Sequence, residues 1–168
     1  QHPCAPDVSA YQSALAISEL HYHPAPPTAA ETAAGFGSAE LFEFIEFKNT
    51  ASVTIDLTGV RMTRGVDFDF PDGLTMAPGS FLLLVKNQAA FQSRYGHSHD
   101  AQIAGSYGSD NLRNSGENVK LSYGTGTPII EFDYLPGPPW PAGPDGTGPS
   151  LTLRLPDSRP DPALPANW

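Results

Sequence analysis

The sequence predicts an all-β protein, an antiparallel sandwich or barrel, and two observations lead to that prediction. The first is a strict alternation of apolar and polar residues, as in residues 53–57 (VTIDL), which gives a strand one buried face. The second is turn chemistry between such segments, as in residues 71–73 (PDG) and 124–126 (GTG). Short strands separated by turns are typical of sandwiches and barrels. With 168 residues, of which 39% are hydrophobic, the chain is long enough for one domain with its own core.

We expect eight to ten strands, and one of them differs from the rest. Residues 81–85 (FLLLV) are apolar on both faces, which predicts a central strand covered on both sides. Leu83 from this segment is expected in the core, together with Phe44, Phe68, Phe70 and Leu121. The remaining expected strands are residues 15–20, 42–47, 53–57, 66–70, 119–123, 130–134 and 151–155.

One short helix is expected at residues 88–95. Asn87 is a favourable N-cap, Phe91 and Tyr95 lie one turn apart on one face, and Gly96 is suited to end the helix. Elsewhere the spacing of apolar residues follows a period of two, so we expect no other helix.

Three segments are expected to be irregular. Residues 1–12 form a polar N-terminal arm, and residues 13–168 form the sandwich domain with a proline-rich C-terminal extension. Within the domain, residues 23–40 and 135–149 are long loops rich in proline, glycine and small residues, and proline removes the donors that regular structure needs. Loops of this length are often functional.

The charge of the chain restricts its partners. Nine Lys and Arg stand against 18 Asp and Glu, which gives a net charge of −9, and the basic residues are scattered. We therefore expect neither nucleic acid nor an anionic membrane surface as a partner. The longest aliphatic or aromatic run has five residues, far below the roughly 20 that a membrane span needs.

Cys4 is the only cysteine, so an intrachain disulfide is excluded and the thiol is expected to be free or bonded to a partner chain. The chain begins with Gln1, as a processed mature form or a fragment would. Few lysines and many Pro, Gly and Thr residues favour an extracytoplasmic location: secreted, periplasmic or on the cell surface.

Four segments occur in an informative order. They are residues 17–24 (ISELHYHP), 43–49 (EFIEFKN) with 55–60 (IDLTGV), 68–79 (FDFPDGLTMAPG) and 112–121 (LRNSGENVKL). Together with PWP at 139–141, DGTG at 145–148 and PANW at 165–168, they resemble the lamin tail domain in its bacterial form over about residues 15–168. His23 and Val60 depart from the Asn and Trp usual in that form.

The resemblance implies an immunoglobulin-like β-sandwich without catalytic activity, used in bacteria as a module of secreted or surface proteins. We therefore expect a structural or protein-interaction module, or an accessory subunit, that works with a protein partner or within a larger multidomain protein. Animal members bind partners that include DNA, but the charge of −9 argues against DNA here.

An alternative function is a glycan- or calcium-dependent binding module. Trp140, between two prolines, could stack on a sugar if exposed, or it could fill one end of the core, as could Trp168. The acidic spacing at Asp67, Asp69 and Asp72 resembles a calcium loop but lacks the glycine and glutamate positions of an EF-hand.

A structural metal ion would have its best ligands in His97, His99 and Asp100, although these residues follow the expected helix as a loop and need not converge. His21 and His23 form a second His-x-His pair. No resident cofactor is expected otherwise.

No catalytic residue is assigned, because no Gly-x-Ser-x-Gly, Walker or His-Glu-x-x-His motif occurs. Glu43 and Glu46 lie an odd number of residues apart on an expected strand, so they face opposite sides and do not form a carboxylate pair of the glycosidase kind. We expect both to be structural, and we expect Glu117 to organise a turn.

Overall fold

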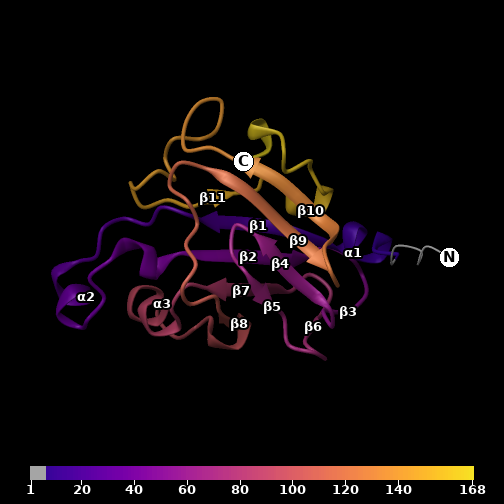
Figure 1. The fold of residues 1–168 in the computed structure, drawn as a ribbon, viewed down its shortest axis with the longest axis horizontal. Helices are drawn as coiled ribbons and strands as arrows, with labels where there is room; N and C mark the ends of the chain where they lie inside the picture. Colours follow the sequence, from indigo (N-terminus) through magenta and orange to yellow (C-terminus); the bar gives the residue numbers. More distant parts are fainter. Residues whose placement is uncertain (1–6) are drawn as a thin grey trace.

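The computed structural model describes residues 7–168, and it is a β-sandwich of two main sheets (Figure 1). The larger sheet has the strand order β11-β1-β2-β7-β8. Its strands are β1 (Leu15–His21), β2 (Phe44–Asn49), β7 (Phe81–Val85), β8 (Ile103–Ser106) and β11 (Leu151–Thr152).

The second sheet has the order β10-β9-β4-β5 and lies across the first. Its strands are β4 (Val60–Arg64), β5 (Phe68–Asp69), β9 (Glu117–Tyr123) and β10 (Thr127–Tyr134). A small ribbon pairs β3 (Ile55–Asp56) with β6 (Thr75–Met76). The predicted fold class, an immunoglobulin-like sandwich with mostly antiparallel pairing, is confirmed.

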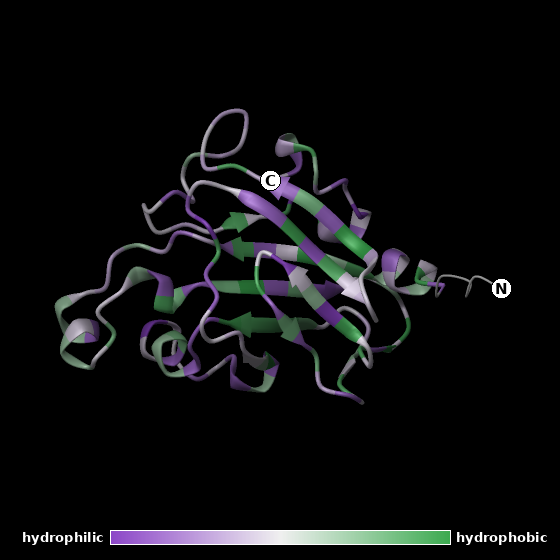
Figure 2. Ribbon diagram, in the orientation of Figure 1, coloured by the Kyte–Doolittle hydropathy of each residue, from purple (hydrophilic) through white to green (hydrophobic). Residues whose placement is uncertain are grey.

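The core forms because the strands carry apolar residues on alternate positions, visible as the banded strands in Figure 2. Phe70 and Leu121 lie in the main core between the sheets, as predicted. Phe68 is only partly buried against that core. Phe44 and Leu83 are also buried, but on the outer face of the larger sheet, where they form a second cluster with Val85 and Phe91.

This second cluster exists because helix α3 (Gln88–Tyr95) covers the outer face of the sheet. The helix occurs where the sequence predicted it. The Asn87 side chain accepts a hydrogen bond from the Ala90 amide, and Gly96 ends the helix with a φ of 78°. Strand β7 is therefore covered on both sides, as its apolar sequence predicted. One pairing was not predicted: β8 follows α3 and lies parallel to β7.

The N-terminal segment differs from the expectation. Residues 9–12 are not irregular, because helix α1 (Ser9–Ala14) begins there. Tyr11 from this helix stacks on Tyr123 of β9 with ring centroids 5.5 Å apart, and Val8 is buried in the core. The expectation of an arm through residue 12 is therefore wrong for residues 9–12.

Loop 23–40 is more ordered than its composition suggested. It contains helix α2 (Ala29–Ala33), with a capping box between Thr28 and Glu31, and a 3₁₀ turn at Ala39–Phe42 that delays the start of β2 to Phe44. Arg94 of α3 fixes the loop through two hydrogen bonds to the Glu31 carboxylate, at 2.8 and 2.9 Å. Hydrogen bonding to Arg94 lowers the pKa of Glu31, and this keeps the carboxylate charged and the clamp closed.

One other expectation changed in detail, and one is confirmed. The strand predicted at residues 53–57 is only Ile55–Asp56, and Val53 is 58% exposed. Residues 135–149 contain neither helix nor strand, as the proline content predicted. No helix in the described part of the chain has the length and apolar character needed to cross a membrane.

Candidate binding groove

One open side of the sandwich lies between strands β1 and β10, and the C-terminal extension (residues 136–168) covers it. Trp168 packs on Phe132 of β10 with ring centroids 5.3 Å apart, and Trp140 packs on Trp168 at 6.1 Å. Both tryptophans are buried, with 6% of Trp140 and 4% of Trp168 exposed. The indole N–H of Trp168 donates to the carbonyl of Pro162, so the buried ring leaves no unpaired donor.

The extension attaches to the larger sheet by adding a short strand. Residues Leu151 and Thr152 pair with Leu20 and Glu19 of β1, and the Leu153 amide donates to the Ser18 carbonyl at 2.9 Å. The chain then turns away, since Leu155 has a left-handed backbone with a φ of 50°. The first half of β1 is therefore left without a strand on this side.

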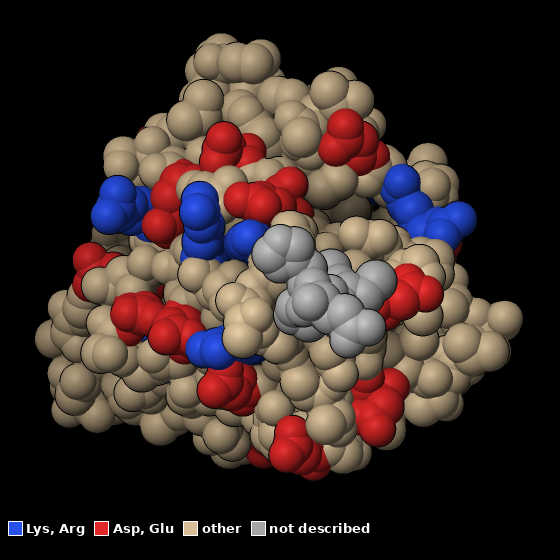
Figure 3. All heavy atoms as spheres, turned by 45° about the vertical axis from the view of Figure 1, so that its right-hand side comes forward, with Lys and Arg blue, Asp and Glu red and all other residues tan. Residues whose placement is uncertain are grey.

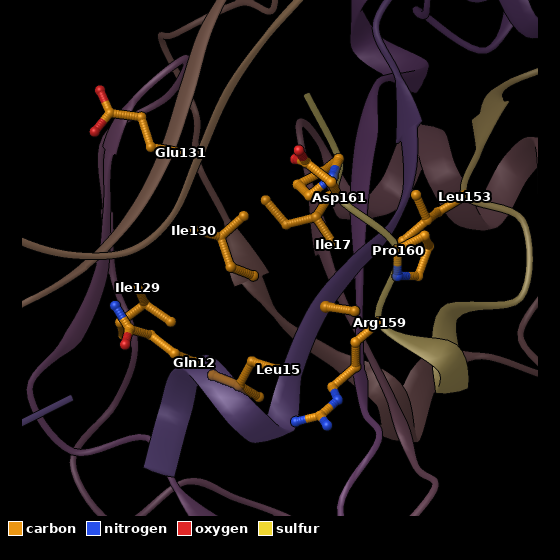
Figure 4. Close-up of a pocket in the computed structure, with 12 residues that line it drawn as sticks. Gln12, Leu15, Ile17, Ile129, Ile130, Glu131, Leu153, Arg159, Pro160 and Asp161 are labelled. Carbon is orange, nitrogen blue, oxygen red and sulfur yellow. The ribbon is translucent and has the colours of Figure 1, made fainter. Parts of the chain in front are cut away.

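A groove of about 280 Å³ occupies the place that the extension leaves open. In Figure 4, side chains of β1 face those of β10 across the cavity, and the extension closes the third side. The lining is apolar at its centre, where Leu15, Ile17, Ile129, Ile130 and Leu153 meet.

A β-bulge presents two successive isoleucines of β10 to this groove. The pairing of β10 with β9 shifts between Pro128 and Ile130, so Ile129 is an extra residue on its strand. Because of that shift, Ile129 and its neighbour Ile130 both line the cavity, whereas a regular strand would send them to opposite faces.

Polar contacts hold the end of the groove that lies beside helix α1, called the lower end below. The Gln12 amide donates to the Pro128 carbonyl at 3.1 Å, and the Arg159 guanidinium donates to the Ser13 carbonyl at 2.8 Å. These two bonds tie helix α1 to β10 and to the extension. Glu131 and Asp161 add carboxylates to the lining.

The strand edges beside the groove have free main-chain groups. In the part of the chain that the structure describes, β10 pairs only with β9, and its outer edge receives one side-chain bond, that from Gln12 to Pro128. Unpaired edges of this kind are templates for another strand. Pro128, Glu131 and Asp133 on β10 are residue types that discourage indiscriminate pairing at such an edge.

The structure does not support the exposed ring assumed for Trp140 as a binding residue. The ring is buried against Trp168, so it fills the end of the sandwich and is not presented to a sugar or a partner. The alternative use of both tryptophans, as plugs of the core, matches their positions. Cys4, the other proposed binding residue, lies outside the described residues.

The proposed metal ligands do not converge. His97 Nδ1 lies 3.0 Å from Asp100 Oδ2, while His99 Nδ1 faces Gln102 at 3.1 Å. Between residues 7 and 168, no three His, Cys, Asp or Glu side chains are grouped as metal ligands.

The second histidine pair divides between two environments. His21 is buried next to Phe44 with ring centroids 5.1 Å apart, and burial lowers its pKa to about 4. His23 instead reaches loop 135–149, where its Nδ1 lies 2.6 Å from Asp145 Oδ1. The two long loops therefore contact each other, which the sequence did not predict.

The carboxylates that the sequence singled out have structural partners. Glu43 is fully buried and accepts hydrogen bonds from the Tyr107 hydroxyl at 3.0 Å and the Leu112 amide at 2.9 Å, and burial raises its pKa to about 8. Glu117 accepts from the Arg113 amide at 2.7 Å and so closes the turn before β9, as expected. Asp67 and Asp69, from the calcium-like spacing, both pair with Arg61.

The two packed sheets, with one open side partly covered by the extension, define the class of protein: an immunoglobulin-like β-sandwich. The model of one family, the Lamin Tail Domain, matches residues 9–135. That match spans well over half of the chain, so the chain belongs to the lamin tail domain family. The family consists of immunoglobulin-like domains with structural and protein-interaction roles and no catalytic activity. A search of curated proteins found no match.

The family match ends at residue 135, just before the extension that covers the open side. The groove was not predicted, because it needs residues 15–17, 129–130 and 153–162 to come together. The adjacent isoleucines 129 and 130 were the one available signal, since two apolar neighbours break the alternation of a half-buried strand.

Proposed function

We propose that this domain is a non-catalytic, extracytoplasmic interaction module that holds an extended segment of a partner polypeptide in the groove between β1 and β10. The observation that carries the proposal is a cavity with an apolar centre, flanked by the outer edge of β10 and by the first half of β1, neither of which has a neighbouring strand on this side among residues 7–168. Extended peptides bind such edges through main-chain hydrogen bonds and place alternate side chains into the adjoining pockets.

The chain's own extension supports this mode of binding. Strand β11 adds to the edge of β1 for two residues, and Leu151 and Leu153 of the extension are buried in the core. A partner segment would continue the same arrangement over the first half of β1, with an aliphatic side chain in the cavity beside Ile17 and Ile130.

The charge of the protein and its composition support the remaining parts of the proposal. On the face drawn in Figure 3, acidic and basic side chains are interspersed and no continuous basic patch is present. With a net charge of −9, a polypeptide is a better partner than nucleic acid. The few lysines and the many Pro, Gly and Thr residues support an extracytoplasmic location.

The test is selection from a display library of random short peptides, followed by hydrogen exchange on the complex. We expect enriched peptides with alternating aliphatic residues and slower exchange at amides of β10. Ile130→Glu should weaken their binding by about tenfold or more, because it puts a charge into an apolar cavity. Val53→Glu is the matched control, since Val53 is exposed and does not line the groove.

Peptides that bind the Ile130→Glu variant as tightly as the parent, or that protect strands remote from β10, would overturn the groove as the site. Circular dichroism confirms that the variant is folded.

The extracytoplasmic location is tested separately by fractionating source cells, where native protein confined to the cytosol would contradict it. Native mass with and without reductant then tests whether Cys4 joins a partner chain.

A further inference from the structure

A second pocket, of about 230 Å³, lies on the outer face of the larger sheet, on the far side of the sheet from the main core. Strands β1, β2 and β7 form its floor, and α3 with the turn that follows it forms its wall. Two carboxylates and four rings line it: Glu19, Glu46, Phe44, Phe91, Tyr95 and His99.

The two carboxylates are direct neighbours across adjacent strands. Glu19 of β1 is the register partner of Glu46 of β2, and like charges placed directly opposite each other destabilise a sheet. Each carboxylate accepts a hydrogen bond from one serine hydroxyl: Glu46 from Ser18 at 2.7 Å, and Glu19 from Ser150. Within residues 7–168, neither forms an ion pair.

The protein offers these carboxylates little compensation of its own. Burial raises the pKa of Glu46, and the hydrogen bond from Ser18 offsets part of this rise. The charge of Glu19 raises the pKa further, while His99 and Lys48 act in the opposite direction. Lys48 is engaged with Asp157 at 2.7 Å. Buried His21, with a pKa lowered to about 4, is neutral near pH 7 and supplies no positive charge.

Aromatic rings form the other half of the pocket. Phe91 and Tyr95 pack 4.8 Å apart, and Phe44 meets them edge-on at 5.6 and 5.8 Å. Ring faces attract cations, and the attraction is stronger where water is partly excluded. The pocket therefore combines two carboxylates with an aromatic surface suited to the methylene stem and head of an organic cation.

We propose that this pocket binds an alkylammonium or guanidinium group, such as the side chain of lysine or arginine or a small free amine. The ammonium lies between Glu19 and Glu46, and its methylene stem lies along Phe44 and Tyr95. A divalent metal fits less well, since Ca²⁺ and Mg²⁺ require about six oxygen ligands and the pocket provides two carboxylates. The site is on the other side of the sheet from the groove, so it stands or falls independently of the proposed function.

The test is calorimetric titration with two amines: butylamine, and a lysine whose α-amino and α-carboxyl groups are both blocked as amides. Calcium chloride and magnesium chloride serve as competing probes. We expect both amines to bind, the binding to weaken as salt is added, and the proton resonances of the Phe44 and Tyr95 rings to shift. Comparable affinity for the two amines would identify a free amine as a sufficient ligand, and tighter binding of blocked lysine would identify a polypeptide as the source.

Substitution of either carboxylate separates a binding role from a structural one. Glu46→Gln and Glu19→Gln should each weaken amine binding at least about tenfold while raising the melting temperature, because each removes the cross-strand repulsion. Asp72→Asn removes the same charge from an exposed turn and should change neither quantity. Amines that fail to bind, that bind both glutamine variants as tightly as the parent, or that are displaced by Ca²⁺ at equal concentration would overturn the proposal.

Discussion

The two open sides of the sandwich are closed in different ways. On the side of β5 and β8, Phe68 lies directly over Gly105, so closely that a Cβ at Gly105 would stand 2.7 Å from the Phe68 ring. On the side of β1 and β10, closure depends on the C-terminal extension and leaves the groove uncovered. The first side is sealed by a ring against a backbone, while the second is covered by a segment that leaves a cavity suited to binding.

The largest effect on stability is expected from removing the Trp168 ring, which fills the side of the sandwich that the extension covers. Trp168→Ala should lower the free energy of unfolding by about 3 kcal/mol, since the ring is 4% exposed and packs on Phe132 and Trp140. Urea unfolding measures the loss, and Leu164→Ala, at a position that is 53% exposed, is the control. A loss below about 1 kcal/mol for Trp168→Ala would mean that the extension is not part of the core.

The next effect concerns the segment that follows β8, which Glu43 holds through Tyr107 and Leu112. The folded pKa of Glu43, about 8, is above its ordinary value of 4.5. The contribution of the protonated Glu43 carboxyl to the free energy of unfolding is therefore fully present below about pH 4.5 and is lost as the pH rises through about 8. We expect a loss of about 2 kcal/mol over this window, because one pKa unit corresponds to about 1.4 kcal/mol and solvent relaxation reduces the total.

Melting temperature measured from pH 5 to pH 9 checks this expectation. Glu43→Gln carries no charge, so it should flatten the decline in stability while keeping an acceptor for Tyr107 and Leu112. The same decline in the parent and in Glu43→Gln would show that another group is responsible.

A third experiment concerns the sealed side. Gly105→Val should cost roughly 1–2 kcal/mol, because the added atoms must displace the Phe68 ring. Gly143→Val is the control, since no atom lies within 4 Å of a Cβ at that position. Equal stability of the two variants would show that Phe68 moves aside freely and that this side is not tightly sealed.

The smallest effect is expected at the rim of the groove. Arg159→Ala removes the bond to the Ser13 carbonyl on an exposed surface and should cost about 1 kcal/mol or less. It should nevertheless speed hydrogen exchange locally in helix α1. Unchanged exchange there would mean that Arg159 does not hold the lower end of the groove.

Local sequence patterns predicted the longer strands β1, β2, β7, β9 and β10, because alternation and turn residues report directly on which face is buried. They did not predict β4 (Val60–Arg64), and the strands expected at residues 66–70 and 151–155 form only at Phe68–Asp69 and Leu151–Thr152. Helix α3 was also predictable from local sequence, since Asn87 and Gly96 are chemically suited to its ends. The parallel pairing of β8 was not, because residues 103–106 alternate weakly and only the crossover through α3 places them beside β7.

The sites were harder to predict because they depend on residues distant in sequence. The fate of Trp140 is decided by Trp168 and Phe132, and proline-rich surroundings are equally consistent with a buried or an exposed ring. The odd spacing of Glu43 and Glu46 correctly excluded a pair between them. It did not reveal that Glu46 faces Glu19, which is set by the register of β1 and β2.

The attachment of β11 to β1 has a consequence for the order of folding. Strand β1 is among the first elements of the chain, but its outer neighbour is separated from it by about 130 residues, and Trp168 comes later still. Contacts between such distant segments form late, because the entropy of closing the intervening loop must first be overcome. During synthesis, Phe132 and Tyr134 therefore emerge before Trp168 can cover this side. We expect the nascent domain to present an apolar edge until residues 151–168 have emerged, which makes that interval its period of greatest exposure to aggregation.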